Sequence, residues 1–243
     1  MAHRPENSQL EKIKGVAKAL VYLDIGETKF SPVIVKHPFT DTGFTLSPMT
    51  HQIVDLMKDK DGLANWQREL VKVIDSSECA GDLLYMITKS YRYAYLKLIE
   101  DYLSVIDLSI LVRDIWIGCE NPSTNQTYTK SSLVRLFKRC KPAIMMSSSD
   151  LEVFDNLPDE IRIYRGIGKV ENPRIRERHI KSLSWSTRVE VAQRFAERRI
   201  GGAGEVYQAI ISKKDVLAYF DDRGESEVVV DPSKLQRVEL LKI

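Results

Sequence analysis

The chain has 243 residues, of which 43% are hydrophobic, so it is long enough to bury a core as one large domain or two small ones. Its net charge of +2 excludes a global electrostatic attraction to nucleic acid. Positive charge is concentrated locally, because residues 162–199 carry 11 Lys and Arg against four Glu, and a basic field of this kind suits an anionic ligand.

Cysteine and histidine are sparse. The three cysteines lie far apart with no C-x-x-C pair, which indicates a reducing compartment and no disulfide framework. The four histidines make no zinc-ligand spacing with them, so no metal is expected. The N-terminus is polar and no stretch is long and apolar enough to cross a bilayer, so we expect a soluble cytoplasmic protein without membrane contacts.

The first part of the chain is predicted to be mainly helical. Residues 8–18 are expected to form a short helix, and the segments 19–23 and 30–35 to form a β-hairpin through Gly26. A loop over 37–50 follows. Helical periodicity then predicts four helices, over residues 49–58, 65–74, 82–102 and 106–116.

The second part changes from helices to strands. Ser131 or Ser132 is expected to cap a helix that runs to about residue 140, and Ser149 or Asp150 to cap another that ends near Leu157. After residue 159, short segments rich in β-branched and aromatic residues alternate with turns. They predict strands over 161–165, 182–186, 205–211, 216–219, 226–230 and 238–241, with one helix over 190–199.

These elements predict an α+β protein. We expect an N-terminal extension over residues 1–45 that contains the hairpin, a helical subdomain over 46–158, and a β-rich core over 159–243. No flexible linker separates the last two parts, so residues 46–243 are expected to pack as one unit.

Two polar motifs fall on strands of the β-rich core. Tyr164-Arg165-Gly166 ends the first strand, where an arginine can make a bidentate phosphate contact and a glycine lets a ligand approach the backbone. Ser184-Trp185-Ser186 lies on the second strand, where alternation places the two serines on one face and the tryptophan on the other. Each motif alone is more often an ordinary surface strand end.

The third motif is Glu225-Ser226-Glu227, at the entrance of a strand that Pro232 terminates. Side chains at i and i+2 of a strand share one face, so the two carboxylates are expected to point the same way. Like charges side by side disfavour joint ionisation, and a sheet edge tolerates them where a cation or polar ligand lies opposite. An isolated pair of this kind is more often solvated; the two upstream motifs favour a site.

Taken in this order, the three motifs resemble the mono-ADP-ribosyltransferase toxin family of the Arg–Ser–Glu type, in its bacterial and phage branch. That family has an arginine on the first core strand, an S-T-S-like strand followed by a helix with Ala and Phe (here Ala192 and Phe195), and E-x-E near the end. Trp185 stands where the family has threonine. The resemblance extends more weakly back to about residue 45. It implies a split β-sheet core behind a helical subdomain, and NAD as substrate without a metal.

The resemblance also implies roles on the NAD side of the site. Arg165, flanked by Tyr164 and Gly166, would bind the NAD pyrophosphate or the nicotinamide ribose. Ser184 would support the NAD site and orient the catalytic glutamate, with Ser186 as second candidate for this role.

On the reaction side, Glu227 would accept the ribose hydroxyl and stabilise the oxocarbenium-like charge as nicotinamide leaves, and Glu225 would orient or deprotonate the nucleophile. Tyr219 or Phe220 is a candidate to stack on nicotinamide, although aromatic residues at this spacing more often belong to the core.

The implied activity is transfer of ADP-ribose from NAD to a macromolecular acceptor, in a toxin or phage-defence effector that an antitoxin or other neutralising protein would restrain. In this family the E-x-E form goes mostly with protein arginine acceptors, whereas the basic run over residues 174–181 suits an RNA or DNA acceptor, complements NAD, or is merely solvated. An NAD glycohydrolase and a catalytically silent binding module are the alternatives. The paired Glu225 favours transfer over hydrolysis.

Overall fold

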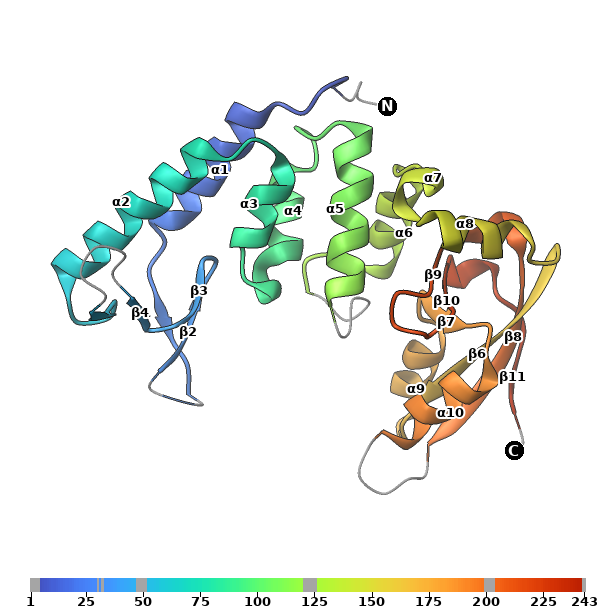
Figure 1. Cartoon of the computed structure of the whole chain (residues 1–243). Helices are drawn as coiled ribbons and strands as arrows, with labels where there is room; N and C mark the ends of the chain where they lie inside the picture. Colours follow the sequence, from blue (N-terminus) through green and yellow to red (C-terminus); the bar gives the residue numbers. More distant parts are fainter. Residues whose placement is uncertain are drawn as a thin grey trace. The chain divides into compact units, whose positions relative to one another are not determined.

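The computed structural model describes residues 5–29, 31, 33–46, 52–119, 126–198 and 204–241. Its contacts divide the chain into two compact units, Met1–Cys119 and Glu120–Ile243 (Figure 1). In the described part of the chain no helix has the length and apolar character that crossing a membrane requires.

The first unit is built from helices with small antiparallel sheets. Strands β1, β2 and β3 form one sheet, and β4 and β5 pair in another. Helices α2 and α5 confirm the predictions over 65–74 and 106–116. The elements are α1 (Leu10–Val21), β1 (Gly26–Glu27), β2 (Ile34–His37), β3 (Thr40–Thr42), β4 (Phe44–Leu46), β5 (Ile53–Asp55), α2 (Lys60–Ser76), α3 (Ala80–Met86), η1 (Lys89–Tyr91), α4 (Arg92–Ile99) and α5 (Val105–Gly118).

The strand predicted over residues 19–23 is wrong, because helix α1 continues to Val21. Ile13, Ala17 and Val21 are fully buried at a spacing of four residues, so the helical period extends into the segment. A hairpin does follow, but Gly26 lies in its first strand rather than in its turn and pairs with Lys36. Phe30, the predicted start of the second strand, lies outside the described residues.

Two helix predictions in this unit are also wrong. The segment 49–58 contains strand β5 instead of a helix. Asp55 at the end of this strand accepts hydrogen bonds from the main-chain N–H groups of Met57 and Lys58, at 3.0 and 3.2 Å. Residues 49–51 lie outside the described residues. The long helix predicted over 82–102 is broken after Met86. Ile87 and Thr88 have extended backbones, and the Thr88 N–H donates to the Pro38 carbonyl at 2.8 Å. β-Branched residues give up little when they leave a helix, so a tertiary hydrogen bond suffices to break it.

The second unit is a six-stranded antiparallel sheet with helices, and it confirms the α+β prediction. All six strands fall where the sequence predicts them, in the order β11-β8-β6-β7-β10-β9. Each adjacent pair is antiparallel. The strands are β6 (Glu160–Ile167), β7 (Ser184–Ser186), β8 (Glu205–Ser212), β9 (Val216–Phe220), β10 (Glu227–Val230) and β11 (Gln236–Leu240).

Helices of the second unit pack on this sheet. Helix α10 crosses β6, β7 and β8, and α6, α7 and α8 each contact β9 (Figure 1). The compact unit therefore begins before these three helices, whereas the domain boundary drawn from the sequence at residue 159 marks only the change from helix to strand. The helices are α6 (Lys130–Lys138), α7 (Pro142–Met145), α8 (Ser148–Asp155), α9 (Pro173–Ile180) and α10 (Val189–Glu197), with one-turn helices η3 (Lys213–Asp215) and η4 (Pro232–Lys234).

The caps of these helices differ from those expected. Thr129 caps α6 by accepting from the Ser132 N–H, and Ser147 caps α8 by accepting from the Asp150 N–H. Helix α9 was not predicted at all, although Asn172 caps it and Pro173 occupies its first position, a combination typical of a helix start.

The sheet opens between β6 and β7. Within these described strands the register contains one pair, Tyr164 opposite Ser186, whereas β6 pairs with β8 along its whole length. The sheet thus consists of two three-stranded halves joined at a narrow junction. On one face a core packs beneath the junction, formed by Ile161, Ile163, Ile167, Trp185, Tyr207, Ala209, Ile211, Val228 and Val230.

Candidate functional site

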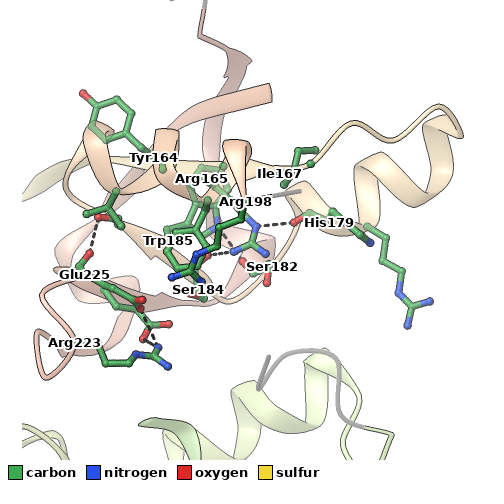
Figure 2. Close-up of a pocket in the computed structure, with 18 of the residues that line it drawn as sticks. Tyr164, Arg165, Ile167, His179, Ser182, Ser184, Trp185, Arg198, Arg223 and Glu225 are labelled. Carbon is green, nitrogen blue, oxygen red and sulfur yellow. Dashed lines mark hydrogen bonds and ion pairs between the residues drawn. The ribbon is translucent and has the colours of Figure 1, made fainter. Parts of the chain in front are cut away.

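A cleft of about 1030 Å³ lies where the two halves of the sheet open. Seven of the residues that the sequence singles out for catalysis or NAD binding line it, and Figure 2 labels Tyr164, Arg165, Ser184 and Glu225 among them. They come from β6, β7, β10 and the segment before β10: Tyr164, Arg165, Gly166, Ser184, Ser186, Glu225 and Glu227.

Arg165 bridges the gap between the two halves of the sheet. Its Nε donates to the His179 carbonyl at 2.7 Å, and its Nη1 donates to the Ser184 carbonyl across the junction (Figure 2). Burial lowers the pKa of Arg165 to about 10, and the negative charge of Glu227 acts in the opposite direction. The guanidinium group is therefore charged at neutral pH and held in one orientation by main-chain oxygens.

The two serines occupy different places in the hydrogen-bond network. Ser186 lies directly opposite Glu227 in the β7–β10 ladder, and its hydroxyl donates to the Glu225 carbonyl at 2.7 Å. Ser184 lies opposite Val229, and among the described residues its hydroxyl makes no hydrogen bond. In this structure Ser186 is thus the serine that fixes the glutamate segment, whereas Ser184 was the first candidate for orienting the catalytic glutamate. Trp185 is buried in the core on the opposite face, as alternation predicts.

Glu225 and Glu227 are brought together by a turn rather than by a strand. Strand β10 begins at Glu227, and Ser226 before it has a φ of 43°, so the alternation expected for Glu225 is wrong. The two carboxylates nevertheless meet at one cation. The Nη2 atom of Arg223 lies 3.0 Å from Glu225 Oε2 and 3.4 Å from Glu227 Oε2. Arg223 thus supplies a positive charge of the kind that lets two carboxylates lie side by side.

The cleft also has a positively charged wall. Lys130 and Arg178 line it beside Arg165, and Arg198 lies over the ring of Phe195 at 4.3 Å from the ring centre. The Lys130 ammonium donates to the Arg178 and Lys181 carbonyls at the end of helix α9. Burial, together with the charges of Arg165 and Arg178, lowers the pKa of Lys130 to about 8. Lys130 precedes the β-rich part and stands in no motif, so no sequence pattern points to it.

The packing adds a structural role for one residue of the motifs and corrects the role expected for the aromatic pair before β10. A Cβ atom on Gly166 would lie 1.8 Å from the Ala192 carbonyl oxygen, so this glycine is needed for the close approach of helix α10, while it also lines the cleft. Tyr219 and Phe220 are only 3% and 2% exposed and belong to the core. Phe195 is the phenylalanine that lines the cleft.

The basic run over residues 174–181 is divided by helix α9. Arg176 Nη2 donates a hydrogen bond to the Val170 carbonyl at 2.8 Å, and Arg176 Nε lies 3.5 Å from Glu205 Oε2. Lys181 pairs with Glu177 at 2.7 Å on the helix surface. Arg178 alone of the arginines in this run lines the cleft, so the described residues do not present the run as one continuous basic face.

No family of proteins, no curated protein and no solved structure matches the chain. What the site can do is therefore argued from its geometry. Among the described residues no three His, Cys, Asp or Glu side chains lie close enough to hold a metal ion. The cleft combines a cationic wall with a pair of acidic side chains, which suits a ligand that carries phosphate at one end and a reacting, cation-like centre at the other.

Proposed function

We propose that the protein is an NAD-dependent mono-ADP-ribosyltransferase with a split-sheet core of the ADP-ribosyltransferase type. One observation carries the proposal: residues of three motifs far apart in the sequence line one cleft at the opening of the sheet, namely Tyr164, Arg165 and Gly166, then Ser184, Trp185 and Ser186, and then Glu225 and Glu227. Residues chosen for a common chemistry need not meet in the fold, so their convergence supports that chemistry.

The cationic wall suits the diphosphate of NAD. Arg165 is fixed by two main-chain carbonyls, and Lys130 and Arg178 supply further positive charge beside it. Preorganised cations of this kind bind phosphate without a cost of reorientation. Phe195 and Arg198 offer a flat surface for a planar ring at the same wall.

The carboxylates suit the reacting sugar. Glu227 is 4% exposed and would stabilise the positive charge that develops on the ribose as the bond to nicotinamide breaks. Glu225, which is more accessible, would orient the nucleophile and take its proton. The acceptor is a macromolecule, a protein arginine or a nucleic acid, and the protein acts as a toxin or phage-defence effector that a neutralising protein would restrain.

The test is incubation of the purified protein with labelled NAD and cell lysate, with nicotinamide release and label transfer measured separately. Glu227→Gln should lower nicotinamide release about 100- to 1000-fold, because it removes one preorganised group that stabilises transition-state charge. Glu160→Gln is the matched control, since Glu160 is an exposed carboxylate of β6 outside the cleft.

Each outcome assigns a function. Label in the protein or nucleic-acid fraction that depends on Glu227 supports transfer and identifies the acceptor. Nicotinamide release without transfer would make the protein an NAD glycohydrolase. Binding of NAD without release in either variant would leave a binding module and contradict the proposal.

A further inference from the structure

Strand β9 lies at one edge of the six-stranded sheet, and its outer side pairs with no described strand. Two main-chain N–H groups on this side donate instead to side chains of the helical segment beside it (Figure 1). The Tyr219 N–H donates to Met146 Sδ at 3.3 Å. The Asp221 N–H, directly after the strand, donates to Asp150 Oδ1 at 3.1 Å. These two contacts fix the place where β9 ends.

Asp150 is a buried acidic residue in the first turn of helix α8, and the proposed site makes no use of it. It is 4% exposed. Its Oδ2 accepts from the hydroxyl and the N–H of Ser147, at 2.7 and 3.3 Å, in the capping box of the helix. The carboxylate is therefore held by its own helix on one side and holds the main chain of Asp221 on the other.

Asp221 in turn holds the residue that lies between the two glutamates. Its Oδ1 accepts from the Ser226 N–H at 2.7 Å and from the Ser226 hydroxyl at 3.3 Å. The Ser226 carbonyl accepts from the Thr187 N–H at 3.1 Å. Both main-chain polar groups of Ser226 are thus fixed by hydrogen bonds.

The backbone of Ser226 needs this support. Its φ of 43° lies in the left-handed region, which a residue with a side chain keeps only where the surrounding contacts impose it. This conformation interrupts the alternation of a strand and brings Glu225 and Glu227 to the same nitrogen of Arg223, at 3.0 and 3.4 Å. The conformation of Ser226 therefore sets the position of one carboxylate relative to the other.

We propose that Asp150 and Asp221 are positioning residues for Glu225 and Glu227. This inference rests on the proposed function. Neither aspartate is among the described residues that line the cleft, so both act through the main chain. They act in series, because Asp150 holds the N–H of Asp221 and the side chain of Asp221 holds Ser226. The cationic wall belongs to other elements and does not depend on this series.

The experiment measures nicotinamide release from NAD by the full chain, with kcat and KM determined separately. Asp221→Ala removes the acceptor for the Ser226 N–H. The kcat should fall about 10- to 100-fold, because misplacing a group of the site by about 1 Å has an effect of this size. KM for NAD and affinity for ADP should change less than about two-fold, since the cationic wall is intact. Asp221→Asn keeps an oxygen that can accept from Ser226 and should restore most of kcat.

The matched control is Asp231→Ala. Asp231 follows the other end of β10 and accepts from the N–H and the hydroxyl of Ser233, at 3.1 and 2.7 Å, so it makes the same kinds of hydrogen bond as Asp221. It is not one of the described residues that line the cleft. Its replacement should lower the Tm without lowering kcat. Thermal unfolding of every variant checks that each is folded.

The series is tested from its other end by Asp150→Ala, which removes the acceptor for the Asp221 N–H. The kcat should fall, but less than in Asp221→Ala, because the side chain of Asp221 is still present. In the double variant kcat should fall no further than in Asp221→Ala alone, since residues of one network are not additive. Additive falls would show that the two aspartates act separately and would overturn the series.

The other outcomes separate this inference from the proposed function. An unchanged kcat in Asp221→Ala, or an equal fall in Asp231→Ala, overturns the positioning role. A raised KM at unchanged kcat assigns Asp221 to NAD binding and overturns it as well. These results leave the proposed function standing, whereas the absence of nicotinamide release from the unchanged chain overturns both.

Discussion

The two sides of the cleft hold their charged groups in different ways. On the cationic side, Lys130 and Arg165 direct their hydrogen bonds to main-chain carbonyl oxygens. On the acidic side, Glu225 and Glu227 face a full opposite charge, Arg223. Carbonyl dipoles orient a cation without cancelling it, whereas an ion pair neutralises its partner.

This difference indicates which side of the cleft is suited to bind a charged ligand. Two cations placed near each other repel, and this repulsion contributes to the lowered pKa of Lys130. A bound diphosphate would reduce this repulsion between the two cations. The acidic side is already compensated by the chain's own arginine, so a cationic ligand would have to displace Arg223 to bind there. We therefore expect changes on the cationic side to weaken anion binding most.

The largest effect is expected for Arg165→Met. The substitution removes the group that joins the two halves of the sheet, leaves the His179 and Ser184 carbonyls without their donor, and takes away one of the positive charges near Glu227. Loss of one partner from a buried charged network costs about 3–5 kcal/mol. The free energy of unfolding, measured by urea denaturation, should fall by about this amount, and calorimetry should detect little ADP binding.

The control for Arg165→Met is Arg162→Met on the same strand. Arg162 is exposed, and its replacement should change the unfolding free energy by less than about 0.5 kcal/mol. An Arg165→Met protein as stable as the unchanged chain would show that the main-chain contacts of Arg165 do not hold the sheet together.

A smaller effect is expected for Gly166→Ala. The new methyl group would lie 1.8 Å from the Ala192 carbonyl oxygen, which is main chain and cannot rotate away. Helix α10 must shift, and Phe195 and Arg198 move with it. Overpacking of this kind costs about 1–3 kcal/mol, which thermal unfolding should reveal as a lower Tm.

Gly15→Ala provides a control of opposite sign. Gly15 lies inside helix α1, and a Cβ atom there would meet nothing within 4 Å. Alanine in a helix interior is favoured over glycine by about 0.5–1 kcal/mol, so this variant should be slightly more stable. Equal destabilisation by both substitutions would contradict the close approach of α10 to β6.

The β-rich part of the fold could be predicted from the sequence because its signals are local. Runs such as Val228-Val229-Val230 between turn residues specify buried strands, and all six strands were found this way. The elements of the first unit were predicted less completely, because tertiary contacts override its local sequence pattern. Thr88 leaves a helical period to bond with the Pro38 carbonyl, which no local pattern contains.

The candidate site was predictable in part for the same reason. Arg165, Ser186 and Glu227 stand in short motifs, so a pattern of residue types could find them. Lys130 stands in no motif and reaches the cleft only through the packing of helix α6. Arg223 also stands in no motif, but it carries a local signal, since it is the cation closest in sequence to the glutamate pair.

The smallest effect concerns the dependence of anion binding on pH. Lys130 has a pKa lowered to about 8, and a bound diphosphate favours its charged form. Affinity for ADP should therefore be highest below this pKa and fall as pH rises through about 8, by a few-fold up to about tenfold, and a tenfold fall corresponds to about 1.4 kcal/mol. Calorimetry in buffers of different ionisation enthalpy should show uptake of protons on binding near this pH.

The control variant is Lys130→Arg, which keeps its positive charge throughout and should flatten the dependence of ADP affinity on pH. Arg165, Arg178 and His179 still line the cleft in both proteins. The same fall in affinity in Lys130→Arg would assign the pH dependence to another group.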